Sequence, residues 1–306
     1  MVPCLMLDPP DLIRLANGLA IRLEGRPAQG TRHVVRFGVL ENTGERVAVK
    51  IEWIAGSLEV ERRALSWLSV QRGPAPRLIA ASTVISHGRR AACLVTERAE
   101  GSAPTTRSGW DRMGHALARL IDIPTAGCDL AVLDPPSFGD RHAQRIRELG
   151  VHLETLAESI EDWTEICSPT IHGATDLVIT HGDPGPGNYL DDNTAGTLID
   201  WEAAQIAPIG LDLARATFIA LLGAGPAGYL GRDHRERARA VAHGYLARVG
   251  QRWRPTTEQL RWWLTVAGIQ FAHHRWQRAG EPRVAPWTDA IDTLRAALTA
   301  PTNPWS

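Results

Sequence analysis

The sequence predicts an α+β fold, with a small β-rich part at residues 1–100 and a larger, mostly helical part at residues 101–306. Three observations lead to this prediction. Short runs of β-branched and alternating apolar residues are concentrated in the first hundred residues. Apolar residues at helical spacing dominate the rest of the chain. A small, polar and turn-rich stretch at residues 97–109 lies between them and is the predicted linker.

The amino-terminal part is predicted to contain a small sheet and one helix. Its strands are expected at residues 31–40, 46–53, 77–83 and 91–96. The turn sequence ENTGE joins the first two strands into a hairpin. The helix is expected at residues 57–70, where Ser57 is a suitable N-cap.

The second part is predicted to be helical from Trp110 onward, with one interruption. A proline-rich loop is expected at residues 122–141, a long helix at 141–167, two short strands at 177–180 and 197–199, and about four helices after Leu211. The two short strands flank a stretch rich in Gly, Pro, Asn and Asp. That stretch is expected to be an irregular loop between them.

Composition is that of an ordinary globular protein. The 306 residues are 44% apolar and 22% charged, and the net charge of −1 does not indicate a nucleic-acid partner. The four cysteines are scattered without a C-x-x-C pair, which is typical of reduced intracellular thiols and not of a zinc site. We find no signal peptide and no membrane span in the sequence, so a cytoplasmic protein is expected.

The segment THGDPGPGNYL at residues 180–190, with LIDWE at 198–202, carries the strongest chemical signal. Asp183 follows an apolar run, and the prolines and glycines after it exclude a helix. Asn188 and Asp200 offer a neutral and an anionic oxygen, which are ligands that suit magnesium. The spacing indicates a phosphoryl-transfer site, in which Asp183 takes the proton of an attacking hydroxyl and the other two residues hold Mg²⁺.

Three further residues accompany this motif. His181 is expected to hydrogen-bond within the loop and to hold Asp183 and Asp200 in place. Glu202 is a candidate for contact with the metal's surroundings or with substrate. Asp212 suits the first turn of a helix, and either a buried contact to the loop or a substrate contact would explain it.

Lys50 is a candidate phosphate ligand. In the strand VAVKI, alternation places Ala48 and Lys50 on one face, where a flat base over Ala48 could extend its phosphates toward Lys50. The alternative is a surface lysine on an edge strand. Glu61 lies in an apolar helical stripe, where an unpaired carboxylate is unfavourable, so we expect it to pair with Lys50. A solvated Glu61, or Glu59 as the partner, is the competing interpretation.

A phosphate-binding loop is less clearly marked. The sequence GRPAQGT at residues 25–31 has two glycines but matches neither G-x-G-x-x-G nor a Walker motif. Backbone amides near Gly30 and Thr31 are candidates for contact with phosphate. An ordinary turn would explain the same residues.

These motifs together resemble the aminoglycoside phosphotransferase and choline kinase branch of the protein-kinase-like superfamily. The resemblance covers about residues 20–220. It rests on six segments, which are VAVK (47–50), Glu61 with RRALSWL, the linker after LVTE (94–97), HGD to Asn188, LIDWE (198–202) and DLA (212–214). Gly182 stands where eukaryotic protein kinases carry Arg, which favours the small-molecule branch.

The resemblance implies a bilobal protein-kinase-like fold, with ATP or GTP and Mg²⁺ between a nucleotide-binding lobe and a helical lobe that carries the catalytic loop. Lys50 would hold the α- and β-phosphates and pair with Glu61. Asp183 would be the catalytic base, with Asn188 and Asp200 as metal ligands. Backbone groups from Glu97 to Ala99 would hydrogen-bond the purine.

The acceptor is expected to be a hydroxyl of a small molecule, such as an antibiotic, choline, a sugar or an amino alcohol. A non-catalytic pseudokinase is the alternative. Only eleven residues separate Asp200 from Asp212, which leaves little room for a platform that binds a protein substrate. Monomer and homodimer both remain open.

The charge of the acceptor is not decided by the sequence. A polyamine antibiotic would need an acidic cleft, for which acids near Glu202 and in the predicted loop at residues 122–141 are candidates, the latter being Asp122, Asp129, Asp134 and Asp140. The last third is rich in Trp, His and Arg at residues 262–276. These tryptophans are expected mostly in the core; lining a cleft, they would suit a planar or a quaternary-amine substrate.

Overall fold

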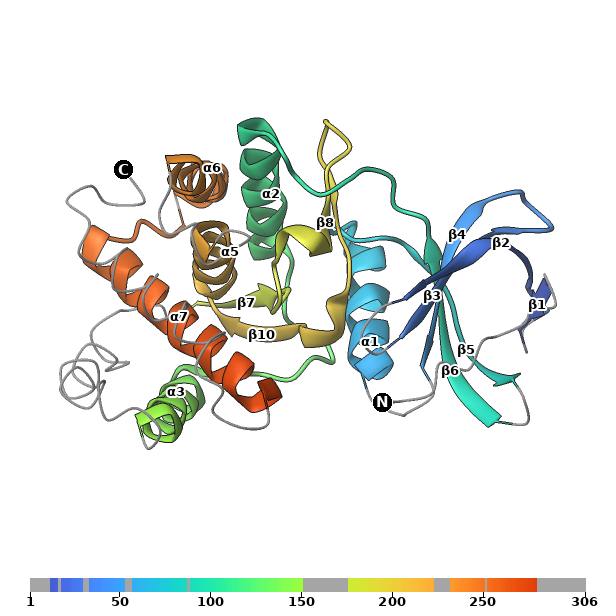
Figure 1. The fold of residues 1–306 in the computed structure, drawn as a ribbon, viewed down its shortest axis with the longest axis horizontal. Coiled ribbons are helices and arrows are strands. Elements are labelled where there is room, and N and C mark those ends of the chain that lie inside the picture. The colour runs from blue at the N-terminus through green and yellow to red at the C-terminus, as the bar shows by residue number, and fades with distance from the viewer. Residues whose placement is uncertain are drawn as a thin grey trace.

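The computed structural model describes residues 12–15, 18–29, 33–52, 57–86, 89–150, 176–222, 232–250 and 252–279. Within them, a six-stranded antiparallel sheet lies at one end of the molecule and the helices α2 to α7 lie at the other (Figure 1). The predicted α+β fold is thus confirmed. The division near residue 100 into two domains stays a prediction.

The sheet has the strand order β1-β2-β3-β4-β6-β5. Its strands are β1 (Leu12–Arg14), β2 (Ala20–Gln29), β3 (Val34–Leu40), β4 (Arg46–Glu52), β5 (Leu78–Ser86) and β6 (Arg89–Glu97). In β4 the residues Val47, Val49 and Ile51 are buried, so the opposite face presents Ala48 and Lys50. Burial of this alternating row stabilises β4 at the centre of the sheet, between β3 and β6.

Strands β1 and β2 were missed in the sequence, where Gly25 and Pro27 interrupt the apolar alternation. The β2–β3 register shifts between Glu24 and Ala28, so the two interrupting residues fall in an irregularity of the ladder. Gly25 has a φ of 63°, a conformation that glycine adopts without strain. Gly30 and Thr31 lie outside the described residues.

Helix α1 (Ser57–Gln71) joins the sheet to the helical part, as Figure 1 shows. The predicted apolar stripe is buried and consists of Leu58, Leu65 and Leu68, with Ala64 beside it. These side chains belong to the same hydrophobic cluster as Trp201 and the residues of α2. Glu61, on the same stripe, therefore lies at the junction of the two parts.

The helical part is built on α2 and α6. Its described helices are α2 (Arg107–Arg119), α3 (Pro135–Gly150), α5 (Leu211–Leu222), α6 (Arg232–Val249) and α7 (Thr257–Ala279), with the short turn η1 (Leu120–Asp122). A Cβ at Gly114 would overlap the Val241 carbonyl, and one at Gly244 would overlap the Asp111 carbonyl. The two glycines permit the close crossing of α2 and α6.

Two predicted boundaries were wrong. Helix α3 begins at Pro135 and not at residue 141, because Asp134 caps it by accepting a hydrogen bond from the Ser137 amide at 2.8 Å. Proline is suited to the first helical turn, where its missing N–H has no partner to lose. Helix α2 begins inside the predicted linker, at Arg107, with Thr106 as its N-cap. The remainder of the long helix expected to residue 167 lies outside the described residues.

Two small sheets support the motif segment. Strand β7 (Leu177–Thr180) pairs with β10 (Gln205–Pro208), and β8 (Tyr189–Leu190) pairs with β9 (Thr197–Leu198). The short 3₁₀ turns η2 (Pro186–Asn188) and η3 (Trp201–Ala203) complete this region. The two predicted strands of this region are thus present. None of the described helices combines the length and the apolar character that a bilayer crossing requires.

Candidate active site

The HGD loop, residues 181–183, directly follows β7 and is hydrogen-bonded by Asp212 of α5. The Asp212 carboxylate accepts hydrogen bonds from the His181 amide at 2.6 Å and from the Gly182 amide at 3.0 Å. Asp212 is buried and lines neither of the cavities described below. The substrate contact considered for Asp212 therefore does not fit the structure; the alternative, a buried contact to the loop, does.

Gly182 is required by the geometry of this loop. Its φ is 83°, and a Cβ at this position would overlap the carbonyl group of Ala203. A residue with a side chain would meet both a strained backbone and a clash with η3. The glycine of HGD thus allows the loop and the Asp200 segment to lie against each other.

His181 stabilises the loop from inside. Its Nε2 lies 2.8 Å from the Ile199 carbonyl oxygen, and its Nδ1 accepts the Asp183 amide at 3.3 Å. The ring packs on Trp201 with the centroids 4.5 Å apart. Burial lowers the pKa of His181, which favours the neutral ring that this pattern of one donor and one acceptor requires. The expected structural contacts of His181 are present.

Arg215 is a member of this site that the sequence did not reveal. From α5, one turn after Asp212, its Nη1 donates to the Gly182 carbonyl and its Nε donates to Gln270 Oε1 at 2.9 Å. Burial lowers its pKa. The signal in the sequence was the i, i+3 spacing from Asp212, which places both residues on one face of the helix.

Asp183 itself is exposed at the surface of the larger cavity. Asn188 Nδ2 donates to the Asp183 carbonyl at 2.9 Å and lies 3.3 Å from Asp183 Oδ2. With its amide nitrogen used in this way, Asn188 retains its side-chain oxygen as a ligand atom. The structure therefore brings Asp183 and Asn188 together, as their spacing predicted.

Lys50 lies among three carboxylates. Its Nζ is 2.7 Å from Glu61 Oε2, 2.5 Å from Asp200 Oδ1 and 2.9 Å from Glu202 Oε1. Burial would lower the pKa of Lys50, but the charges of Glu61 and Asp200 outweigh it and raise the pKa. The expected Lys50–Glu61 pair is thus present, and Asp200 and Glu202 of the LIDWE segment reach the same ammonium group.

His33 is a second residue that sequence reasoning missed. It lies buried just before β3, with Nδ1 2.7 Å from Glu202 Oε1 and Nε2 3.4 Å from Glu52 Oε1. Glu52 in turn accepts the Leu58 amide at 3.2 Å, near the start of α1. Burial would lower the His33 pKa, but the hydrogen bond with Glu202 raises it. A lone histidine at a strand start carries no motif that could have predicted this contact.

Lys50 and the carboxylates of Glu61, Asp200 and Glu202 form a charged cluster, and two cavities meet beside it. The smaller, of about 420 Å³, lies under the sheet and is lined by Lys50 and Glu61, by apolar residues and by the segment from Glu97 to Gly101. The larger, of about 620 Å³, lies within the helical part and is lined by Asp183. Asp200 and Glu202 line both cavities. Ala48 and Ala99 line the smaller one, as their predicted contact with a nucleotide requires.

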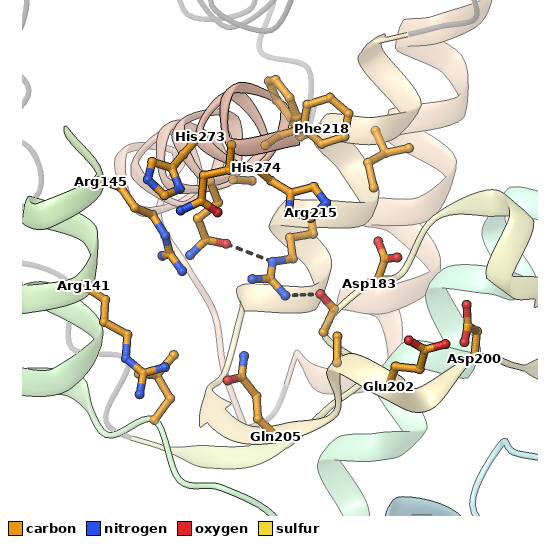
Figure 2. Close-up of a pocket in the computed structure, with 18 residues that line it drawn as sticks. Arg141, Arg145, Asp183, Asp200, Glu202, Gln205, Arg215, Phe218, His273 and His274 are labelled. Atoms are coloured by element: carbon orange, nitrogen blue, oxygen red, sulfur yellow. Dashed lines mark hydrogen bonds between the residues drawn. The ribbon is translucent and has the colours of Figure 1, made fainter. Parts of the chain in front are cut away.

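The larger cavity is lined by both carboxylates and guanidinium groups. The four aspartates named as candidate acids at residues 122–140 do not line it, whereas Glu202, the other candidate position, does. Asp134 caps α3, and Asp122 pairs with Arg248 at 2.7 Å. Trp262 and Trp263 are buried in the core, as expected. Arg141 and Arg145 of α3 and Arg215 of α5 instead project into this space (Figure 2).

The charged cluster suits a divalent cation. Carboxylate oxygens of Glu61, Asp200 and Glu202 lie within 4.8 Å of one another. Asn188 borders the same cavity and adds a neutral oxygen. An all-oxygen set of this kind is what Mg²⁺ and Ca²⁺ prefer. Asp200 has a φ of 66°, an unusual conformation for aspartate that aims its carboxylate at this point.

The structure is similar to several solved structures of small-molecule kinases and phosphotransferases. The structure is similar to macrolide 2'-phosphotransferase type I, with a TM-score of 0.58 and 16% identity, covering 92% of this chain and 93% of that one. It is also similar to choline kinase from Cryptosporidium parvum Iowa II, with a TM-score of 0.59 and 14% identity over 89% and 88% of the two chains. At these identities the likeness concerns the fold, and it agrees with the predicted bilobal arrangement.

Sequence comparison leads to the family. Streptomycin 3''-kinase of Streptomyces griseus is 32% identical over 146 residues, which are 42% of this chain and 52% of that protein. The chain thus spans about half the length of this curated relative. The model of the phosphotransferase enzyme family matches residues 29–263, which is most of the chain. On this match, the chain belongs to the phosphotransferase enzyme family.

Proposed function

We propose that this chain is a small-molecule kinase, which transfers the γ-phosphoryl group of ATP or GTP to a hydroxyl group. The observation that carries the proposal is the meeting of two cavities at Asp200 and Glu202, with Lys50 in one and Asp183 in the other. A nucleotide in the smaller cavity would direct its terminal phosphate toward an acceptor in the larger one. Membership of the phosphotransferase family supports the same reaction.

The smaller cavity suits a purine nucleotide. Ala48 and Leu94 offer a flat apolar surface for a base, and the segment from Glu97 to Ala99 offers backbone donors and acceptors beside it. Lys50, on the same face as Ala48, would bind the α- and β-phosphates. Glu61 is well buried, with 7% of its side chain exposed. It would remain paired with Lys50 while the phosphates replace other partners of the ammonium group.

Asn188 and Asp200 are the proposed metal ligands. The Asp200 side chain is 42% exposed, so its second oxygen is accessible from the cavity. Mg²⁺ bound there would neutralise phosphate charge as the phosphoryl group is transferred. Glu202 is a further oxygen donor at this point, since it already contacts Lys50 and His33.

Asp183 is the proposed base, which orients the acceptor hydroxyl and takes its proton. Its position is set by its neighbours, because Asn188 hydrogen-bonds its carbonyl and Asp212 holds the two preceding amides. Rate enhancement would then come from alignment of the reacting groups and from neutralisation of charge. Both need a rigid loop, which these contacts provide.

The acceptor that we propose to test first is an antibiotic hydroxyl, because streptomycin 3''-kinase is the relative with 32% identity. A metabolic alcohol of the choline or amino-alcohol type is the second class. Release of ADP or GDP in the presence of each compound would identify both the acceptor and the preferred purine.

Replacing Asp183 with asparagine tests the proposal. Loss of a positioned base costs about 100-fold or more in turnover. Because Asp183 does not line the nucleotide cavity, nucleotide affinity should stay within about threefold, a change worth well under 1.4 kcal/mol. Asp140→Asn, at an exposed position of α3, is the matched control and should keep full turnover. Full turnover in Asp183→Asn would refute the assignment.

A further inference from the structure

The wall of the larger cavity opposite Asp183 is cationic. Arg141 and Arg145 project from α3 one turn apart, and Arg215 enters from α5 (Figure 2). His273 and His274 of α7 border the same space. The carboxylates of the cavity lie at its other end, where it meets the nucleotide cavity. Arg215 lies beside the HGD loop, whereas Arg141 and Arg145 lie across the space from Asp183 (Figure 2). The space is therefore polarised, with negative groups around the reacting point and the two arginines of α3 away from it.

Arg145 has binding capacity that no described residue uses. Its side chain is partly buried, and its Nη1 is shielded from solvent without a hydrogen-bond partner among the residues that the structure describes. Arg215, in contrast, already donates to Gly182 and to Gln270. A shielded guanidinium donor without a partner is unfavourable, and an oxyanion would satisfy it.

The surrounding charges support this interpretation. Burial, followed by the positive charges of Arg215 and Arg141, lowers the pKa of Arg145 to about 10. Glu148 acts in the opposite direction, but its carboxylate is engaged by His273 at 2.5 Å and by Gln144 at 2.8 Å. A bound anion would relieve the mutual repulsion of the arginines.

We infer that the acceptor carries an oxyanionic group, a carboxylate or a phosphate ester, which Arg141 and Arg145 bind while its hydroxyl lies at Asp183. The planar guanidinium matches both groups in a two-point contact. A polycationic acceptor would meet the arginines of this wall and be disfavoured. The inference rests on the proposed function, which identifies this cavity as the acceptor site.

A binding experiment tests the oxyanion site without knowing the acceptor. The protein is saturated with the Mg²⁺ complex of a non-hydrolysable ATP analogue, and its melting temperature is followed with sodium sulfate and sodium acetate against sodium chloride at equal ionic strength. Sulfate should raise the melting temperature more than chloride does, since a ligand of the folded state stabilises it. The bound analogue fills the γ-phosphate position, so sulfate that still binds occupies the acceptor side.

Variants on α3 locate the effect. Arg145→Gln should weaken sulfate binding about tenfold or more, while Arg145→Lys, which keeps the charge without the planar fork, should fall between it and the native protein. Arg147→Gln is the matched control, because Arg147 is exposed on the same helix and does not line the cavity. Equal melting shifts with sulfate and chloride, or an undiminished sulfate shift in Arg145→Gln, would overturn the inference. Loss of sulfate binding once the analogue is bound would assign the arginines to the nucleotide's own phosphate.

Turnover with matched acceptors separates this inference from the proposed function. Hydroxyl compounds of one scaffold, with a carboxylate, a phosphate, no charge or an ammonium group, are compared for release of ADP. The anionic members should be favoured, and Arg145→Gln should raise their KM about tenfold with little change in kcat. Turnover that is faster with the ammonium compounds and is unchanged in Arg145→Gln would contradict the oxyanion site but would agree with the proposed kinase activity. Sulfate binding that depends on Arg145, without turnover of any acceptor, keeps the oxyanion site and counts against the kinase.

Discussion

Replacing Lys50 with methionine tests how the candidate site holds its negative charge. Methionine keeps the apolar stem and removes the ammonium group that contacts Glu61, Asp200 and Glu202 at 2.5 to 2.9 Å. The three carboxylates lie within 4.8 Å of one another. Without Lys50 they would face each other as like charges in a partly buried space. The structure therefore predicts a large loss of stability that depends on pH.

Two energies limit the size of this loss: the repulsion between the carboxylates and the cost of protonating one of them. At an effective dielectric constant of about 20, two like charges at this separation repel by about 3.5 kcal/mol. Asp200 is 42% exposed, so solvent reduces its share. The protein escapes the repulsion by protonating one carboxyl, which from an ordinary pKa of about 4.3 costs about 4 kcal/mol at pH about 7.5 and about 1.6 kcal/mol at pH about 5.5. The deficit of Lys50→Met should shrink accordingly as the pH falls.

Urea unfolding in the presence of a chelator measures this deficit at both pH values. Glu61→Gln is the matched control, because it leaves Lys50 between Asp200 and Glu202. Its cost should be about 1 kcal/mol, as for one hydrogen bond, and should change little with pH. A Lys50→Met deficit that stays constant between the two pH values, or that is no larger than that of Glu61→Gln, would refute the reasoning.

Two further predictions concern the loop and the histidine. Gly182→Ala should cost about 3 kcal/mol or more in urea unfolding, because its backbone is left-handed and its Cβ would overlap Ala203. Gly187→Ala, in open space on the same segment, should change stability by less than about 0.5 kcal/mol, and equal costs would contradict the clash. The raised His33 pKa means that protonated His33 stabilises the fold below its ordinary pKa and loses this effect as the pH rises through the raised value. His33→Gln should therefore lower the melting temperature more at pH about 6 than at pH about 8.5, and the reverse order would contradict the assigned contact.

The Lys50–Glu61 pair shows what a sequence can predict. Strand alternation placed Lys50 beside Ala48, and a carboxylate in an apolar helical stripe needed a cation. Both arguments use spacing within one element, and the structure brings the two side chains to 2.7 Å. The segments around Asp183, Asn188 and Asp200 were recognised for the same reason, because the three residues lie close together along the chain.

The residues that were missed depend on contacts between distant elements. Arg215 reaches Gly182 across thirty-three positions, and His33, just before β3, reaches Glu202 in η3. The spacing of Arg215 from Asp212 indicates a shared helix face but not the contact with Gly182, and no local pattern encodes the contact of His33. The proline-rich start of α3 was interpreted as loop, although Asp134 followed by two prolines is a helix start. The side chains that α3 contributes to the cavity include Arg141 and Arg145 and none of the four candidate aspartates.

Arg215 contacts both the loop that carries Asp183 and the cavity proposed for the acceptor. Asp183 depends on a loop whose amides are held by Asp212 and whose carbonyl, at Gly182, accepts from Arg215. The same guanidinium lines the cavity proposed for the acceptor. An acceptor anion that drew Arg215 away from Gly182 would disturb the loop that carries Asp183. An anion held by Arg141 and Arg145 would leave it in place. If Arg141 and Arg145 bind the anion and Arg215 holds the loop, as proposed, the cavity would take a charged acceptor without disturbing the alignment of Asp183.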